Sequence, residues 1–400
     1  GSLLGLPVMY RDSRTDGMIE KVLARIPARE LFAATGNQLM FYNTLLQLLA
    51  EQERHPERMA AARKLLFMPD LMSYWLSGVA VQESTIASTG QLVNAGTGDW
   101  ARGLLDQLGL PQHLFGPITR PGTVLGPLLP HIAEKTGLTA KVVAVGGHDT
   151  ASAVVAVPSQ DPHSVYLSSG TWSLLGVMSP KAVVEEQSFA LGFSNEGGVS
   201  GDIRLLKNLC GLWLIQECKR EWDAGGPVSW DVLTDEARAA PAFVSLVDPD
   251  DPRFSSPGDM PARLRAYCRE TGQPEPATHG AMSRMIFESL ALKYRLVYEK
   301  LQQLTGTPLG SLHIVGGGCR NALLNQFAAD ALNREVIAGP MEATAAGNVL
   351  MQLVADGAVA DIQAGRELIR HSFGVQTFSP REPGPWDKVL PRFQALCEGA

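Results

Sequence analysis

The residues best suited to chemistry lie in three short stretches that are rich in glycine and small side chains. The first is residues 145–153 (VGGHDTASA), where a predicted strand ends in two glycines and a helix begins. This arrangement places Asp149 near a helix N-terminus at the edge of a sheet, where open α/β folds bind ligands. A carboxylate there can act as a general base toward a substrate hydroxyl. The alternative is that Asp149 only caps the helix, and the spacing alone favours this simpler role.

The second and third stretches have the residue types of phosphate and nucleotide sites. Residues 167–173 (LSSGTWS) predict a tight turn whose backbone N–H groups can bind phosphate, although an ordinary hairpin turn is the simpler interpretation. Residues 314–321 (IVGGGCRN) predict a strand, a glycine turn and a helix, as in nucleotide-binding folds. Asn321 stands where a dinucleotide fold needs its last glycine, and no Walker A sequence occurs. The glycines therefore favour close approach of a purine or ribose over an NAD-dependent enzyme.

The composition is that of a packed globular protein with two or three domains. The 400 residues are 45% hydrophobic and 19% charged, and the formal net charge is −7. An acidic chain without basic clusters argues against nucleic acid or anionic membrane as a partner. Five widely spaced cysteines without a C-x-x-C motif predict a reduced, cytoplasmic protein with no zinc site. No apolar run reaches the roughly 20 residues that span a bilayer.

The elements that must position these stretches alternate between strands and helices, which predicts an α/β architecture. Strands are expected at residues 3–10, 141–145 and 311–315, and a long periodic helix at 281–304. Residues 208–220 are predicted to form one helix. Asn208 and Gln216 would then lie a little over two turns apart and could face a common cleft, or they are simply surface amides.

The stretches occur in an order that resembles the FGGY carbohydrate kinases, and among them most closely the rhamnulokinases. The resemblance covers essentially the whole chain, and its most specific parts are YLSSGTWS and LKNLCGLWLIQ. The matching residues are 10–17 (YRDSRTDG), 68–71 (MPDL), 147–153 (GHDTASA), 166–173 (YLSSGTWS), 195–198 (NEGG), 206–216 (LKNLCGLWLIQ), 248–254 (DPDDPRF), 268–272 (CRETG) and 313–321 (HIVGGGCRN).

The resemblance implies the actin/Hsp70-like ATPase fold, which is ribonuclease H-like, with two α/β domains around a cleft. We expect a sugar-binding domain at residues 1–158, truncated at its start, and an ATP-binding domain at residues 159–378. Residues 379–400 are expected to form a C-terminal helix that packs back on the first domain.

The resemblance also implies a reaction and a set of site residues. ATP, with Mg²⁺, would phosphorylate the primary hydroxyl of L-rhamnulose to give L-rhamnulose 1-phosphate in L-rhamnose catabolism. Asp149 matches the general base of the family. The other implied contacts are His148, Thr150 and Asn208 to the sugar, and Thr171, Gln216 and Gly317 to ATP, with no metal ligand among the protein residues.

One departure from the family pattern is plain, and it leaves alternatives open. The family's first strands and its phosphate loop, which positions Mg·ATP, have no counterpart, and the resemblance begins near residues 6–8. We therefore expect an N-terminally truncated kinase that is weakly stable and nearly inactive alone, because lost strands expose unpaired edges. The alternatives are an FGGY kinase for another sugar, such as fuculose or xylulose, and a non-catalytic nucleotide- or sugar-binding relative or inactive fragment.

Overall fold

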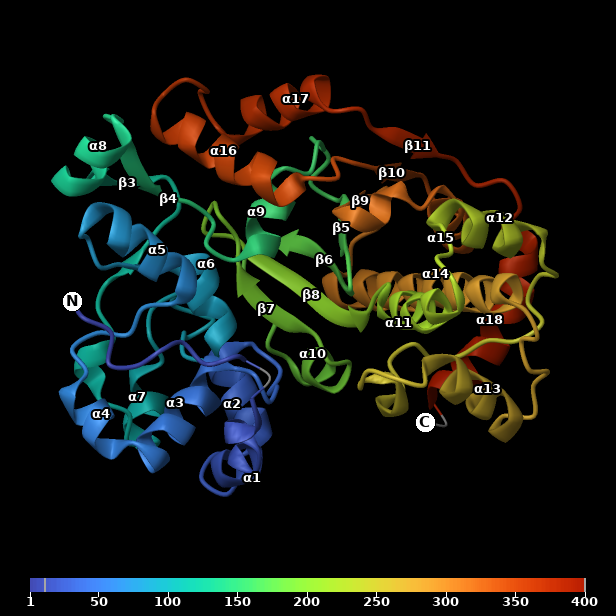
Figure 1. Cartoon of the computed structure of the whole chain (residues 1–400), viewed down its shortest axis with the longest axis horizontal. Coiled ribbons are helices and arrows are strands. Elements are labelled where there is room, and N and C mark those ends of the chain that lie inside the picture. Colours follow the sequence, from blue (N-terminus) through green and yellow to red (C-terminus); the bar gives the residue numbers. More distant parts are fainter. Residues whose placement is uncertain (11, 399–400) are drawn as a thin grey trace. The chain divides into compact units, whose positions relative to one another are not determined.

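The computed structural model describes residues 1–10 and 12–398, which form two compact units (Figure 1). Arg11, which lies in the YRDSRTDG stretch, is outside the described residues. Each unit is assembled from three separate segments, whereas the sequence predicted contiguous domains. The first unit contains Gly1–Ala156, Met178–Leu206 and Thr344–Gly365, and the second contains Val157–Val177, Lys207–Ala343 and Arg366–Ala400.

The first unit consists mainly of short helices with a few short strands. The helices are α1 (Met18–Leu23), α2 (Ala28–Thr35), α3 (Thr44–Arg54), α4 (Pro56–Ala61), α5 (Met68–Ser77), α6 (Ser84–Ala87), α7 (Arg102–Gln107), α8 (Pro130–Thr136), α9 (Asp149–Val155), α10 (Glu186–Ala190) and α16 (Ala343–Ala355). The strands are β1 (Gln82–Glu83), β2 (Ile118–Thr119), β3 (Thr123–Pro127), β4 (Lys141–Ala144) and β7 (Ser194–Gly197).

The core of the first unit lies among α1, α2, α3 and α7. Val22, Leu31, Leu45 and Leu105 are all completely buried there. On α3 the buried leucines follow helical spacing, and the charged residues of its last turns point outward. The strands β3 and β4 pair antiparallel, and β1 pairs parallel with β2. These small sheets end next to the loops that carry the candidate site.

The second unit contains the strands β11-β10-β9-β5-β6-β8, in that order, of a seven-stranded sheet whose last strand is β7. Its parallel strands β5 and β9 are paired in register, with Ser168 opposite Val315. Because both strands run in one direction, the turns that follow them lie at the same edge of the sheet. The strands are β5 (Val165–Ser169), β6 (Trp172–Ser179), β8 (Ile203–Cys210), β9 (Leu312–Val315), β10 (Val336–Ala338) and β11 (Gln376–Phe378), and the ends of β6 and β8 extend into the first unit.

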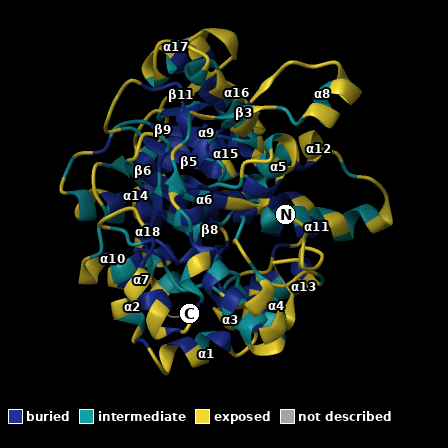
Figure 2. Ribbon diagram, turned by 90° about the vertical axis from the view of Figure 1, so that its left-hand side faces the viewer, coloured by how far each residue is buried: buried dark blue, intermediate teal, exposed yellow. Residues whose placement is uncertain are grey.

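The longest helix, α14, is buried along most of its length (Figure 2). It begins after Thr278, whose hydroxyl accepts a hydrogen bond from the Ala281 N–H, and it ends at Gly306 with φ +64°. The helices of this unit are α11 (Trp213–Trp222), α12 (Trp230–Ala239), α13 (Met260–Glu270), α14 (His279–Thr305), α15 (Ala322–Leu332), α17 (Ile362–Ser372, which starts in the first unit) and α18 (Pro383–Glu398).

The structure corrects three expectations about elements. Residues 3–10 form no strand. Asn208 lies on β8 and Gln216 on α11, so they do not share a helix; pairing with strands distant in sequence extends β8 to Cys210, and no local periodicity reports such pairing. The C-terminal helix α18 packs within the second unit, because the Trp386 ring lies 5.4 Å from the ring of Phe327 on α15.

Candidate active site

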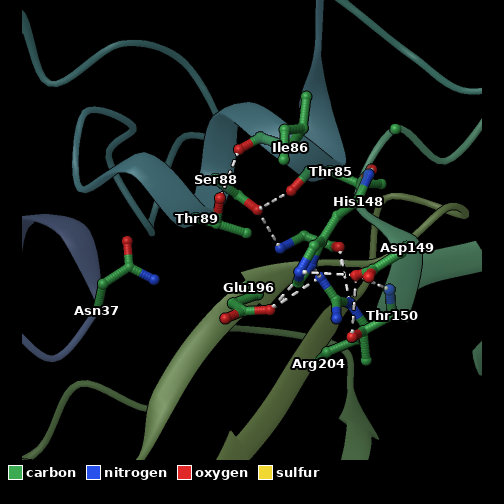
Figure 3. A network of polar contacts seen from close by, with 12 residues as sticks. Asn37, Thr85, Ile86, Ser88, Thr89, His148, Asp149, Thr150, Glu196 and Arg204 are labelled. Atoms are coloured by element: carbon green, nitrogen blue, oxygen red, sulfur yellow. Dashed lines mark hydrogen bonds and ion pairs between the residues drawn. The ribbon is translucent and has the colours of Figure 1, made fainter. Parts of the chain in front are cut away.

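Asp149 is the first residue of α9 and directly follows the loop after β4 (Figure 3). The N-cap position is His148, not Asp149, and the His148 side chain makes no capping hydrogen bond. Asp149 Oδ1 accepts a hydrogen bond from the Thr150 N–H at 2.7 Å. The Asp149 side chain is 79% exposed, so its carboxylate remains accessible to a substrate. Asp149 therefore combines a backbone position at the start of α9 with a carboxylate that is exposed to solvent.

Two side chains from the β1–α6 segment hold the backbone of this loop. Glu83 Oε2 accepts a hydrogen bond from the Gly147 N–H at 2.8 Å, and Thr85 Oγ1 accepts one from the His148 N–H at 3.1 Å. A Cβ at position 147 would come within 2.9 Å of the same Glu83 oxygen. The glycine predicted at the end of the strand is thus required for the close approach of Glu83.

The His148 ring lies between Asp149 and a buried ion pair. Its Nε2 is 3.4 Å from Asp149 Oδ1. Its Nδ1 is 2.9 Å from Arg204 Nη2 and 3.4 Å from Glu196 Oε2 (Figure 3). Arg204 and Glu196 are 3.0 Å apart, with the arginine side chain completely buried. The His148 ring therefore links Asp149, the predicted base, to the buried ion pair of Arg204 and Glu196.

The electrostatics of the ion pair favour its charged form. Burial disfavours the carboxylate of Glu196, but the nearby charge of Arg204 outweighs this effect and lowers its pKa to about 2. Glu196 is consequently ionised near neutral pH. The ion pair therefore places one positive and one negative charge beside the His148 ring, whose Nε2 lies 3.4 Å from Asp149 Oδ1.

Thr150, the third residue of the predicted sugar-binding group, lies on the same turn but is almost entirely buried. Its hydroxyl is 3.4 Å from Asp149 Oδ1. Thr344 Oγ1 donates a hydrogen bond to the backbone oxygen of Asp149 at 3.3 Å. The first unit therefore brings together His148, Asp149 and Thr150, which the sequence had already placed side by side.

In the second unit, the predicted ATP-binding residues gather at the turns that follow β5 and β9. The Thr171 hydroxyl donates a hydrogen bond to Gln216 Oε1 at 3.0 Å, although 45 residues separate them. Gly316 has φ +84°, and a Cβ on it would lie 2.9 Å from the backbone oxygen of Ser169. A Cβ on Gly318 would also collide with Ser169, whereas one on Gly317 would meet no atom within 4 Å. Gly317 therefore offers open space beside the turn.

Asn208 is on β8, separated by two residues from the contact of Gly211 with the β5–β6 turn. The Gly211 N–H donates a hydrogen bond to the Thr171 oxygen at 3.1 Å, and a Cβ on Gly211 would lie 2.6 Å from the backbone carbon of Trp172. Asn208 thus belongs to the unit that holds Thr171, Gln216 and Gly317. Among the described residues, no hydrogen bond joins Asn208 to Thr171, Gln216 or Gly317.

The residues that the sequence reasoning missed are those that support the predicted base. Glu83 and Thr85 hold its loop, and Glu196 and Arg204 hold its histidine. The sequence contained a signal for Glu196 and Arg204, because each is a charged residue within a short strand of mostly apolar or small residues. Residues 195–198 were singled out only for their family resemblance.

No group of three or more His, Cys, Asp or Glu side chains within residues 1–10 and 12–398 is arranged to hold a metal ion. Mg²⁺ in phosphoryl-transfer sites is bound largely through substrate phosphates and one or two carboxylates. Among the described residues, no helix combines the length and the apolar composition needed to cross a bilayer.

Comparison with family models assigns both parts of the chain. The N-terminal domain of the FGGY family of carbohydrate kinases matches residues 2–156, and the C-terminal domain matches residues 165–355. The chain belongs to the FGGY family of carbohydrate kinases. It is therefore an enzyme that transfers phosphate to a sugar, and the NAD-dependent alternative is wrong.

Individual rhamnulokinases are also similar to this chain over nearly its whole length. The chain is 47% identical over 395 residues to a rhamnulokinase from Bacteroides thetaiotaomicron, a match that covers 98% of this chain and 81% of that protein. It is 43% identical over 398 residues to a rhamnulokinase from Pectobacterium carotovorum, covering 100% of this chain and 79% of that protein.

Solved FGGY structures confirm the expected two-domain actin/Hsp70-like fold class. A xylulose kinase from Lactobacillus acidophilus superposes with a TM-score of 0.80 at 16% identity, over 100% of this chain and 80% of that one. A Plasmodium falciparum glycerol kinase with ADP superposes with a TM-score of 0.78 at 14% identity, over 99% of this chain and 78% of that one.

Proposed function

We propose that this FGGY kinase transfers the γ-phosphoryl group of ATP to the primary hydroxyl of L-rhamnulose, with Asp149 as general base. The observation that carries the proposal is the identity of 40–47% with rhamnulokinases over nearly the whole chain. The xylulose kinases among the structural neighbours are only 16–21% identical. Rhamnulose is therefore favoured over xylulose as the substrate, and the products are L-rhamnulose 1-phosphate and ADP, as in L-rhamnose catabolism.

The proposed mechanism uses the exposed carboxylate of Asp149. As the sugar oxygen forms its bond to the γ-phosphorus, the bond to the leaving oxygen of ADP breaks, and the hydroxyl proton passes to Asp149. A positioned base typically contributes about 10²–10⁴-fold to such a step. His148, which lies 3.4 Å from the carboxylate, holds it in place, and His148, Thr150 and Asn208 orient the sugar.

Thr171, Gln216 and Gly317 are assigned to ATP in this proposal. The turn that carries Thr171 presents a hydroxyl and backbone N–H groups, which suit phosphate oxygens. The open space beside Gly317 suits the flat surface of a nucleoside. Mg²⁺, when bound, neutralises phosphate charge, and the residues of this chain contribute orientation rather than covalent chemistry.

The test is ADP release by this chain with Mg·ATP and a panel of L-rhamnulose, L-fuculose and D-xylulose. We expect that any release, however slow, depends on L-rhamnulose and is lost in the D149N variant. Faster turnover of another ketose would overturn the substrate assignment. ATP binding without release for any sugar would instead support the non-catalytic relative or the inactive fragment.

A further inference from the structure

Arg204 and Glu196 form a buried cross-strand pair directly beneath the site. Glu196 on β7 and Arg204 on β8 are opposite each other in the antiparallel register, so their side chains point to the same face of the sheet. That face carries the His148 ring (Figure 3). The sheet therefore places a charged pair where it can act on the histidine beside the proposed base.

Burying the charged Arg204 side chain costs free energy of folding, so a contribution to stability does not by itself explain its position. None of its side chain is exposed, and its Nη1 has no hydrogen-bond partner among the described residues. A buried ion pair seldom stabilises a protein more than well-packed apolar residues of similar volume. Besides its ion pair with Glu196, Arg204 forms two specific contacts, because Nε donates to the Gly197 oxygen at 3.0 Å and Nη2 reaches His148 at 2.9 Å.

The contact between Arg204 and His148 determines the position of the histidine proton. A guanidinium has only donors, so Nη2 can form its 2.9 Å hydrogen bond only if Nδ1 of His148 carries a lone pair. The proton of the neutral ring is then on Nε2, the nitrogen 3.4 Å from Asp149 Oδ1. Without Arg204, Glu196 would remain 3.4 Å from Nδ1 and would favour a proton there instead.

We propose that Arg204 is a positioning residue that holds His148 in its Nε2–H tautomer and thereby directs a hydrogen-bond donor toward the Asp149 carboxylate. Glu196 orients Arg204, and the hydrogen bond from the His148 N–H to Thr85 fixes the backbone beneath the ring. The catalytic consequence rests on the proposed role of Asp149, whereas the tautomer itself does not. Arg204 acts only through His148, since it makes no contact with Asp149 among the hydrogen bonds and ion pairs described.

The first experiment measures the tautomer without any need for turnover. The full chain is labelled with ¹⁵N-histidine, and the His148 signals are assigned by their loss in the H148Q variant. We expect the Nε2–H tautomer in the unaltered chain and in R204K, and loss of this preference in R204M. An unaltered chain with the proton on Nδ1, or an R204M spectrum that is unchanged, would overturn the proposal.

A matched control separates this effect from general loss of a buried ion pair. Arg284 is a second poorly exposed arginine, paired with the buried Glu288 at 2.7 Å, and its described hydrogen bonds go to Glu288 and to backbone oxygens. R284M should lower stability as R204M does, yet leave the His148 signals unchanged. Altered His148 signals in R284M would show that the tautomer responds to any loss of packing, and would overturn the assignment to Arg204.

The second experiment tests the catalytic consequence by a double-mutant cycle. R204M should lower kcat for L-rhamnulose by about 10–100-fold, the range found when the orienting partner of a metal-bound histidine is lost, with little change in KM for ATP. In the H148Q background the same substitution should cost less than twofold, because the route through His148 is already gone. Additive losses would contradict the proposal. If the first experiment shows the expected tautomers but no variant turns over, the proposed function is contradicted, whereas the positioning role of Arg204 is not.

Discussion

The surroundings of Asp149 and the turns around Gly317 are built by opposite means. Near Asp149, charged side chains from strands, together with Thr85 from a short helix, hold the loop and the histidine. Near Gly317, backbone approaches backbone, and glycines at 316 and 318 leave no room for a side chain beside Ser169. The first region should therefore respond to changes of charge and proton position. The second should respond to changes of volume.

The chemistry proposed for each region explains this difference. A base must have a defined protonation state and a defined direction, and these come from hydrogen bonds to charged groups. A nucleotide presents a flat ring and phosphate oxygens, which need close backbone approach and N–H donors. The predictions below test whether the two regions really differ in this way.

The largest effect is expected from D149N, which removes the basic oxygen and keeps the size of the side chain. We expect kcat to fall by about 10²–10⁴-fold, the usual contribution of a positioned base. The dissociation constant for ATP, measured by calorimetry, should stay within about twofold, because the residues assigned to ATP lie in the other unit. A parallel fall in ATP affinity would mean that Asp149 serves binding rather than proton transfer.

The next effect concerns the support of the Asp149 loop. Asp70 Oδ1 accepts a hydrogen bond from the Glu83 N–H, and Oδ2 is buried without a hydrogen-bond partner among the described residues. Burial raises the pKa of Asp70 to about 7. A raised carboxyl pKa means that the folded state holds the proton more tightly, so this contribution is complete below about pH 4 and is lost as the pH rises to 7.

The D70N variant removes this titration and retains the acceptor oxygen. At pH 8 it should have a higher free energy of unfolding, by up to about 4 kcal/mol at about 1.4 kcal/mol per pKa unit. At pH 4 the two proteins should be nearly equal. Urea unfolding at both pH values measures the difference, and an equal gain at each pH would show that the charge of Asp70 is not the cause.

A smaller effect is expected from G316A, because the left-handed backbone and the approach to the Ser169 oxygen both oppose a Cβ. The expected loss is about 1–3 kcal/mol in the free energy of unfolding. G317A is the matched control, since a Cβ there meets nothing within 4 Å, and its stability should be unchanged. If G317A nevertheless raises KM for ATP, the nucleotide lies beside this residue as proposed; equal stability losses in the two variants would contradict the difference in packing.

The smallest effect is expected from T171V, which removes the hydroxyl bound to Gln216 and keeps the shape of the side chain. A single neutral hydrogen bond contributes about 0.5–1.5 kcal/mol, so KM for ATP should rise by roughly 3–10-fold. T171S retains the hydroxyl and should behave like the unaltered chain. A change in KM for the sugar alone would move Thr171 out of the proposed ATP site.

Much of the fold was predictable, because its main signals are local. The long helix predicted at residues 281–304 is present as His279–Thr305, and the strand predicted at residues 311–315 is present as Leu312–Val315. The helix predicted around Asn208 is wrong, because apolar spacing near a strand end resembles helical spacing when the partner strands are not known. The candidate site followed the same rule, since neighbouring residues such as His148 and Asp149 could be proposed from the sequence and their distant supports could not.

By itself, the sequence determined the local pieces of this protein: the glycine turns, the long helix, and the carboxylate at the start of α9. These depend on residues within a few positions of one another, so turn geometry and apolar spacing suffice to predict them. Only the tertiary structure decided that Arg204 lies opposite Glu196 and donates to His148, 56 residues away in the chain. Strand pairing brings such residues together, and its register depends on the whole sheet rather than on any short stretch of sequence.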